Sequence, residues 1–319
     1  MPKLIAAPSK EERVVARFNA GCVKIGDGIV LLLWRKNRKF PRPGQPVDIT
    51  SSFEKVILVD GKARIEEEVL ERNNLPKGHI NLEDPRIFRL GKKLLIGVSS
   101  VDKNGIPHPA LVEAEFPFGK ADFSKPFVFE NLPPGKNFTF VEETVALYRM
   151  DDDKYNNTLA YLEMKKTTDG VWQAKLRKDK LIRFPQDLPW ANYRIGLTGN
   201  EKIYLPNGNF ILLVHGVSKS YEYTLGRAEF TLDWDLVSVD RKPILTYSQM
   251  QELCPDDVHH QEFNADKRVI YSCGYYLDKK LVHVFVTNKE RTIREVCFPK
   301  EKLCQPFKEP LGVRVPVVV

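Results

Sequence analysis

The sequence of 319 residues contains no apolar run of about 18 residues, the length that a membrane-spanning helix needs. Its first segment, MPKLIAAPSKEERVV, also lacks the continuous apolar core of a secretory signal peptide. The chain is therefore expected to be a soluble cytoplasmic protein with no membrane partner.

Cysteine is scarce and irregularly spaced. The five cysteines are an odd number and include no Cys-x-x-Cys pair, which favours reduced thiols over a disulfide framework or a zinc site. The rings of the adjacent pair His259-His260 would point to opposite faces of a strand, so a solvated loop pair is expected there. The sequence therefore predicts no metal site and no cofactor.

Positive charge is present without the clustering that nucleic-acid binding requires. The chain has 49 Lys and Arg against 42 Asp and Glu, a net charge of +7, and no basic tract interleaves with aromatic residues. Nucleic acid is therefore not an expected partner. A modest basic excess is compatible with a small anionic ligand.

Helical periodicity is also rare. It is arguable only at residues 65–73 (IEEEVLERN) and 248–253, whereas short β-rich runs bounded by Gly, Asn, Asp and Lys dominate the chain. The expected fold class is therefore all-β, with short helical segments confined to loops.

Five runs share one format, in which a polar residue, a strand and a tight turn precede a strongly apolar strand. Their turns centre on positions 27, 92, 153, 208 and 279, so consecutive turns are 55 to 71 residues apart. The runs are FNAGCVKIGDGIVLLLWR, EDPRIFRLGKKLLIGVSS, EETVALYRMDDDKYNNTLAYLEM, NEKIYLPNGNFILLVHGV and KRVIYSCGYYLDKKLVHVFVTN.

A recurrence of about 60 residues with room for four short strands is typical of a β-propeller blade. We therefore predict one five-bladed propeller domain over residues 1–319, with residues 1–12 as an extended N-terminal arm. A β-sandwich with irregular hairpins is the alternative fold, and a homo-oligomer is compatible with either.

Polar residues occupy a similar place in four of these runs. Asn19, Asp84, Glu142 or Glu143, and Glu201 each precede the assigned turn centre by a similar number of residues. The innermost strand of each blade starts at one mouth of the central funnel, so these side chains are expected to converge there. A carboxylate at such a mouth is a catalytic candidate.

At this point several separate blocks of sequence resemble glycoside hydrolase family 130. The resemblance runs from about Arg17 to Arg291 and implies inverting phosphorolysis or hydrolysis of β-mannosides by a five-bladed propeller. The matching blocks are FNAG at 18–21, LLLWR at 31–35, EDPR at 83–86, HGV at 215–217, YTLGRAEFTLDWD at 223–235 and KPIL at 242–245.

The resemblance implies roles for particular residues. Asp84 would be the general acid. Asn19, Arg35 and Arg86 would hold the mannosyl unit or orient Asp84, and Trp190, in loop-like sequence, could line an acceptor subsite. The residues implied as phosphate ligands are Arg149, Arg194, His215 and Tyr223.

The two reactions need different groups. Inorganic phosphate carries nearly two negative charges and needs cationic and hydrogen-bonding partners, but its attack requires no catalytic base. Attack by water requires a second carboxylate about 6.5–9.5 Å from the acid. Glu142, Glu143 and Glu201 are the candidate bases for hydrolysis.

The chain departs from the family pattern in three places. Where the family has a basic residue followed by Asn, this chain offers Glu130-Asn131, or Lys136-Asn137 if a loop is shorter. Glu201 lies in a stretch, 196–209, that replaces a family block, and Glu290 is only a loose counterpart of a late family aspartate.

Three functions remain open. The first is phosphorolysis of a β-mannoside oligosaccharide to mannose 1-phosphate, with inorganic phosphate as co-substrate. The second is hydrolysis by an inverting β-1,2-mannosidase. The third is a non-catalytic propeller that binds carbohydrate or protein.

Overall fold

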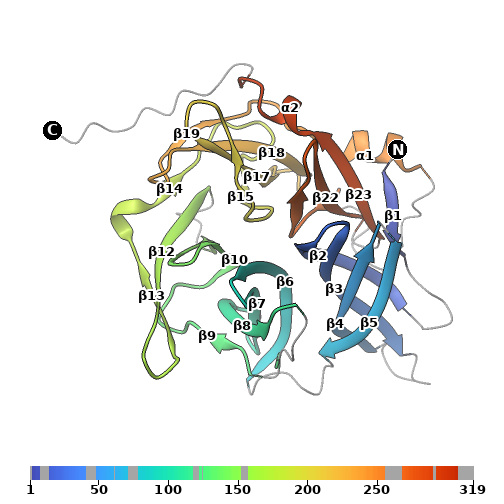
Figure 1. Ribbon diagram of the computed structural model, residues 1–319, viewed down its shortest axis with the longest axis vertical. Helices are drawn as coiled ribbons and strands as arrows, with labels where there is room; N and C mark the ends of the chain where they lie inside the picture. Colours follow the sequence, from blue (N-terminus) through green and yellow to red (C-terminus); the bar gives the residue numbers. More distant parts are fainter. Residues whose placement is uncertain are drawn as a thin grey trace.

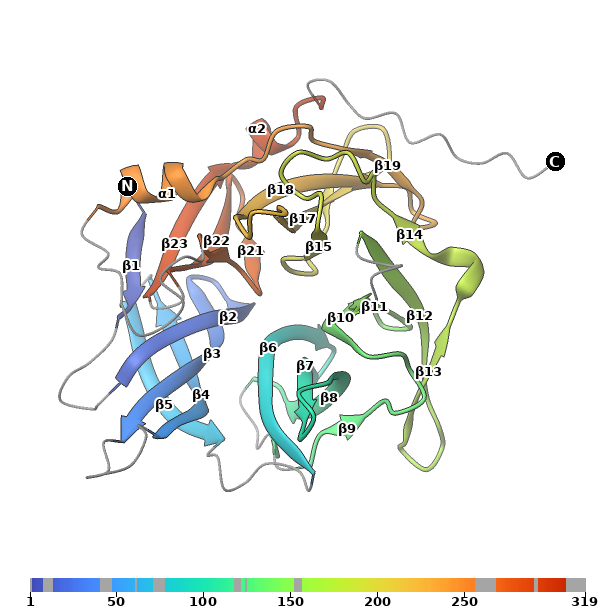
Figure 2. The ribbon, with the colours of Figure 1, turned by 180° about the vertical axis from the view of Figure 1, so that it is seen from behind.

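The computed structural model describes residues 2–7, 14–40, 48–60, 62–70, 78–117, 122–123, 125–151, 157–255, 268–289 and 292–307. The strands in this part of the chain form five antiparallel sheets, which are arranged as a ring around a central axis (Figures 1 and 2). The predicted five-bladed β-propeller is confirmed. Among these residues, no helix has the length and apolar character to cross a membrane.

Blades 1 and 2 are four-stranded meanders in which each strand pairs with the next along the chain. Their strands are β2 (Val14–Gly26), β3 (Ile29–Phe40), β4 (Asp48–Val59), β5 (Lys62–Leu70), β6 (His79–Leu90), β7 (Lys93–Asp102), β8 (Pro107–Glu115) and β9 (Phe127–Val128). The helix predicted from residue 65 is therefore wrong, because residues 62–70 form β5. Pairing with β4 satisfies the backbone of this charged outermost strand and outweighs the local helical pattern.

Blades 3 and 4 each carry one additional short strand. The elements of this part of the chain are β10 (Gly135–Glu142), β11 (Val145–Met150), β12 (Thr158–Lys166), β13 (Trp172–Leu176), the 3-10 helix η3 (Lys178–Lys180), β14 (Ile182–Arg183), β15 (Arg194–Leu197), β16 (Ile203–Tyr204), β17 (Phe210–Val217), β18 (Tyr223–Phe230) and β19 (Leu236–Val239).

Blade 5 combines the two ends of the described chain. Its strands are β20 (Ile270–Tyr271), β21 (Tyr275–Leu277), β22 (Leu281–Asn288), β23 (Thr292–Pro299) and the N-terminal β1 (Lys3–Ala6). Residues 3–6, expected to belong to an extended arm, instead pair with β23 and close the ring as an outermost strand. The remaining helices are α1 (Tyr247–Leu253), close to the predicted 248–253, and α2 (Lys300–Leu303).

The hydrophobic core is divided among the five seams between neighbouring blades. Strand β7 illustrates why: Leu94 packs toward blade 1, and the next residue, Leu95, packs toward blade 3. Successive strand residues point to opposite faces, so a blade that is covered on both sides is apolar at nearly every position. The inner ends of the blades remain available for polar side chains.

Candidate active site

The inner strands of blades 1, 2 and 3 share a backbone irregularity. Asn19, Asp84 and Asn137 have φ values of +56°, +54° and +62°, and the pairing register shifts at each of these positions. Asn and Asp are the side-chain-bearing residues that best tolerate the left-handed region. Each irregularity is a β-bulge, which redirects one polar side chain out of the regular alternation.

The glycine that ends the FNAG block explains how these bulges approach one another. A Cβ atom at Gly21 would lie 2.1 Å from the carbonyl oxygen of Pro85, so any side chain there would clash with the backbone of blade 2. The close approach brings Asn19 within hydrogen-bond distance of Asp84: Asn19 Nδ2 donates to Asp84 Oδ1 at 2.7 Å. The backbone N–H of Asn19 donates to Thr287 Oγ1 of blade 5 at 2.6 Å.

These bulges border a cavity of ≈ 340 Å³, called the axial cavity below, because all five blades contribute to its wall. It brings together Asp84 with six other residues that are site candidates from the sequence. The lining residues are Phe18, Asn19, Arg35, Asn37, Glu83, Asp84, Lys136, Asn137, Arg149, Arg194, His215, Tyr223, Val269 and Tyr271.

One part of this wall, formed by Asn19, Arg35, Glu83 and Asp84 and called the carboxylate side, contains charges that are closely paired. Glu83 accepts hydrogen bonds from Arg35 at 3.1 Å and from Lys136 at 2.8 Å. Burial by itself raises the pKa of Glu83, but Lys136 and Arg35 outweigh it and lower the pKa below its ordinary value. Glu83 is therefore ionised and engaged with two cations at neutral pH.

Another part of the wall, formed by Arg149, Arg194, His215 and Tyr223 and called the cation side, contains cations with few anionic partners. Arg149 is 6% exposed, and within the described part of the chain its side chain has no hydrogen bond or salt bridge; the Nε atom is buried without a partner. Burial, followed by the positive charge of Arg194, lowers the pKa of Arg149. Arg194 has a long ion pair, in which its Nη2 atom lies 3.5 Å from Asp151 Oδ1. Two adjacent cations with so little compensation have the chemistry to accommodate an anion.

A chain of hydrogen bonds beneath the cavity sets the state of His215. Arg86 donates to Tyr271 Oη at 2.9 Å, Tyr271 donates to Asn137 Oδ1 at 2.7 Å, and Asn137 Nδ2 lies 3.2 Å from His215 Nε2. Burial, Arg86 and Arg149 together hold the pKa of His215 well below its usual range. The imidazole is therefore neutral, and because Asn137 Nδ2 can only donate, the ring proton belongs on Nδ1.

Arg86 and Trp190 do not line the axial cavity. Arg86 is fully buried beneath it and also donates to the carbonyl of Thr198 at 2.9 Å. Trp190 is 5% exposed and packs between blades 3 and 4, where Gly216 and Gly226 leave room for its ring and Asp240 O accepts from its Nε1 at 2.9 Å. Trp190, a candidate for an acceptor subsite, therefore lies in the core of this seam and not on the axial cavity, because the glycines of two of the resembling blocks make room for its ring.

Glu142 and Glu143 also lie away from Asp84, contrary to the predicted convergence. They adjoin the turn between β10 and β11, and Glu142 is bonded to Lys202 and to Trp234. The turn expected as the first of blade 3 is centred near Asp153, which lies outside the described residues. The chain near residue 153 connects β11 to β12, so the expected first turn of blade 3 is one strand too late. The residue of blade 3 that is equivalent to Asn19 and Asp84 is Asn137.

Glu201 is displaced for a different reason. Six residue steps lead from Leu197 to Ile203, whereas their partners Val214 and Ile211 are three steps apart, so this inner strand holds three extra residues. The side chain of Glu201 lies near Lys24 and Leu277, close to the turns at the other end of the inner strands. Burial raises the pKa of Glu201 there, far from the cavity wall that contains Asp84.

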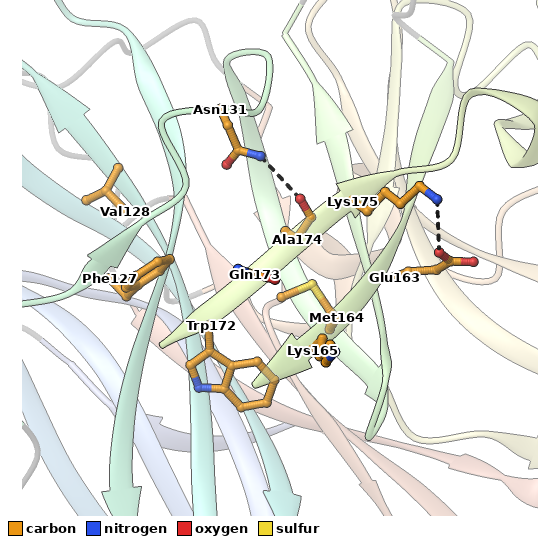
Figure 3. A pocket seen from close by; sticks show the side chains of 10 residues that line it. All are labelled: Phe127, Val128, Asn131, Glu163, Met164, Lys165, Trp172, Gln173, Ala174 and Lys175. Carbon is orange, nitrogen blue, oxygen red and sulfur yellow. Dashed lines mark hydrogen bonds and ion pairs between the residues drawn. The ribbon is translucent and has the colours of Figure 1, made fainter. Parts of the chain in front are cut away.

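The structure also distinguishes Lys136-Asn137 from Glu130-Asn131. Lys136 and Asn137 both line the axial cavity, and Lys136 is the direct strand partner of Arg149. Asn131 instead borders a separate cavity of ≈ 520 Å³ on the outer side of blades 2 and 3 and donates to Ala174 O at 3.2 Å (Figure 3). The shorter-loop alignment is therefore the one that the geometry supports. Glu290 lies outside the described residues.

Glu83, Asn37 and Tyr271 also line the cavity without having been site candidates, and Lys136-Asn137 was a candidate only as the shorter-loop alternative. The signal for Asn137 was present, because Phe18-Asn19, Glu83-Asp84 and Lys136-Asn137 occupy equivalent places in successive inner strands. Tyr271 had no such signal: it reaches Asn137 only because blade 5 closes against blade 1.

No protein-family model and no curated protein matches the sequence. Solved five-bladed structures do match the fold. A β-1,2-mannobiose phosphorylase from Listeria innocua, in complex with β-1,2-mannobiose, superposes with a TM-score of 0.67 at 17% identity and covers 91% of each chain.

Two further structures extend this similarity. A glycosyl hydrolase from Bacteroides ovatus has a TM-score of 0.62 at 14% identity and covers 97% of this chain and 94% of that one. A mannose phosphorylase from Leishmania mexicana, in complex with a phosphate ion, has a TM-score of 0.55 at 13% identity and covers 98% and 92%. The predicted resemblance to mannoside phosphorylases is thus confirmed at the level of the fold.

Proposed function

We propose that this chain is a carbohydrate-active enzyme of the glycoside hydrolase family 130 type, which cleaves β-mannosidic bonds with inversion by phosphorolysis. The observation that carries the proposal is the composition of the axial cavity, where Asp84 shares one wall with the poorly compensated cations Arg149 and Arg194. A sugar and an anion can therefore be bound in one cavity.

In this proposal Asp84 protonates the leaving glycosidic oxygen, directly or through a sugar hydroxyl. Asn19 holds one carboxyl oxygen by its 2.7 Å hydrogen bond and leaves the other available for the proton. Arg35, which lines the cavity beside Glu83, contacts the mannosyl unit. Arg86 acts from beneath as a positioning residue, because its charge and its bond to Tyr271 support the base of the cavity.

Phosphate occupies the cation side. Arg149 and Arg194 neutralise its charge, Tyr223 provides a hydrogen bond that sets its orientation, and neutral His215 completes the wall without adding charge. Binding brings the nucleophile beside the sugar and compensates two cations whose burial is otherwise unfavourable. Attack on the anomeric carbon from the face opposite the leaving group gives α-mannose 1-phosphate.

Hydrolysis is the less well supported alternative, because it requires a catalytic base. Glu142, Glu143 and Glu201 do not line the cavity, and the other described carboxylate that does, Glu83, is bound by Arg35 and Lys136. A carboxylate with a lowered pKa and two cationic partners is a poor proton acceptor. A non-catalytic sugar-binding propeller would have no need for the anion site.

The deciding experiment measures products from β-1,2-mannobiose and related β-mannosides with and without inorganic phosphate. We expect mannose 1-phosphate to form in proportion to phosphate and to disappear when phosphate is omitted. Free mannose released at the same rate without phosphate would establish hydrolysis instead. No turnover of any β-mannoside, with saccharide binding retained by Asp84→Asn, would favour the non-catalytic function.

A further inference from the structure

A second group of reactive side chains lies on blade 5, apart from the axial cavity. His283 is on β22, and Glu295 and Cys297 are on β23 (Figure 1). His283 is the direct strand partner of Cys297, and Phe285 is the partner of Glu295. Residues two apart on a strand point to the same face, so all three side chains project from one face of the blade.

The three potential ligand atoms are close enough to share one ion. His283 Nδ1 lies 2.8 Å from Glu295 Oε1 and 3.4 Å from Cys297 Sγ, and all three atoms lie within 4.8 Å of one another. Ligand atoms of a tetrahedral zinc site are roughly 3.3–3.7 Å apart, as follows from zinc bond lengths of about 2.0–2.3 Å. The nitrogen–sulfur separation already fits this range, and the nitrogen–oxygen separation has to increase by about half an ångström.

The other nitrogen of His283 is held as metal-bound histidines usually are. Nε2 lies 2.8 Å from Asp278 Oδ2, while the second oxygen of Asp278 accepts the backbone N–H groups of Lys280 at 2.7 Å and Leu281 at 2.6 Å. The ring of Tyr276 stacks on His283 at 4.4 Å with an interplanar angle of 9°. The imidazole orientation is therefore fixed, with Nδ1 directed at Glu295 and Cys297.

We propose that His283 Nδ1, Glu295 Oε1 and Cys297 Sγ form a binding site for Zn²⁺ on blade 5, with Asp278 as the carboxylate that orients the histidine. One nitrogen, one oxygen and one sulfur ligand suit zinc better than Mg²⁺ or Ca²⁺, which prefer oxygen alone. A neutral imidazole, a carboxylate and a thiolate balance the charge of the ion. Cys297 is exposed, which gives the metal an entry route and leaves a fourth position for water.

The position of the site indicates a structural effect. Glu295 is the strand partner of Lys3 in β1, the strand that closes the ring, and Phe285 packs in the seam between blades 5 and 1. An ion held by both β22 and β23 would stabilise this closure. None of its ligands lines the axial cavity, so the site is independent of the proposed catalytic function.

Zinc titration of the metal-free full-length protein tests the proposal. We expect one equivalent of Zn²⁺ to bind, to raise the melting temperature and to slow alkylation of Cys297. Co²⁺ should give a thiolate-to-metal charge-transfer band. Cys297→Ser should abolish the band and the protection, whereas Cys304→Ser, the matched control on a thiol after α2, should retain both.

Asp278→Asn separates the orienting carboxylate from the ligands. It should keep the charge-transfer band but weaken zinc affinity by about 10–100-fold. The proposal is overturned if zinc fails to bind at one equivalent, or if Cys297→Ser binds it with unchanged affinity and stabilisation. Because Cys297 is exposed, its variant should fold normally, which a circular dichroism spectrum would verify.

Discussion

The two sides of the axial cavity contain similar numbers of charged groups but satisfy them in opposite ways. On the carboxylate side, Glu83 is bonded to Arg35 and Lys136, and Asp84 to Asn19. On the cation side, Arg149 has no such partner within the described residues, and Arg194 has one distant ion pair. Charges that are paired internally maintain the shape of a site, whereas buried cations without a partner leave binding energy available for an anionic ligand.

The largest expected effect comes from Asp84→Asn. Removing the ionisable proton of the proposed acid should reduce kcat by about 10²–10⁴-fold, while the amide retains the size of the side chain and the fold. Steady-state rates with mannobiose, together with thermal unfolding, measure the two properties. Retention of most of the rate in a folded variant would disprove the assignment of Asp84.

Arg149→Met should affect the other side of the cavity. Losing a charged hydrogen-bond donor should raise the phosphate KM by about 10–100-fold. The melting temperature without phosphate should stay the same or rise, because a buried cation without a partner is removed. Arg89→Met, on an exposed arginine of β6, is the matched control. An unaltered phosphate response in Arg149→Met would refute the anion site.

Glu83→Gln tests the carboxylate side of the axial cavity. The substitution leaves Arg35 and Lys136 without their shared anion and should lower the free energy of unfolding by about 1–3 kcal/mol. Denaturant unfolding measures the change.

The ion pairs of Glu83 with Arg35 and Lys136 also predict how the stability of the fold depends on pH. The pKa of Glu83 is lower in the folded protein than its ordinary value of 4.5, so the unfolded state binds more protons in acid. The stability that ionised Glu83 contributes to the folded protein is therefore complete above about pH 4.5, and it is lost as pH falls through the pKa of Glu83 in the folded state. Equal acid sensitivity of the wild type and Glu83→Gln would contradict this.

The smallest effect is expected for Glu142→Gln. Glu142 lies at the turn between β10 and β11 and pairs with Lys202, so its loss should change kcat less than twofold and cost at most about 1 kcal/mol of stability. A large fall in hydrolytic rate without phosphate would restore Glu142 as a base candidate.

Particular residues explain why the sequence predicted the fold better than the site. Conspicuous turns such as Asp27-Gly28, Gly91-Lys92 and Asn207-Gly208 made the repeat visible, because glycine and asparagine adopt turn conformations that other residues avoid. The first turn of blade 3 is Glu143-Thr144, which carries no such signal. The turn pattern therefore indicated the next connection, near residue 153, in place of the turn that follows the Asn137 bulge.

The proposed zinc site is a second case in which spacing along the sequence does not indicate which residues lie together. Glu295 and Cys297 are two residues apart, which indicates one strand face, but nothing in their spacing relates them to His283. Only the register between β22 and β23 places the three together. The absence of Cys-x-x-Cys spacing speaks only to ligands that are close in sequence, whereas the proposed site takes its ligands from two paired strands.

The sequence by itself determined the number of blades, because turn chemistry and strand alternation are local properties of the chain, and the family resemblance indicated seven of the fourteen cavity residues. Tertiary structure decided which charges are paired. That outcome depends on the closing of the ring, which brings residues from five blades to one axis. It gives Glu83 two cationic partners and, within the described residues, leaves the Arg149 side chain without an anionic one.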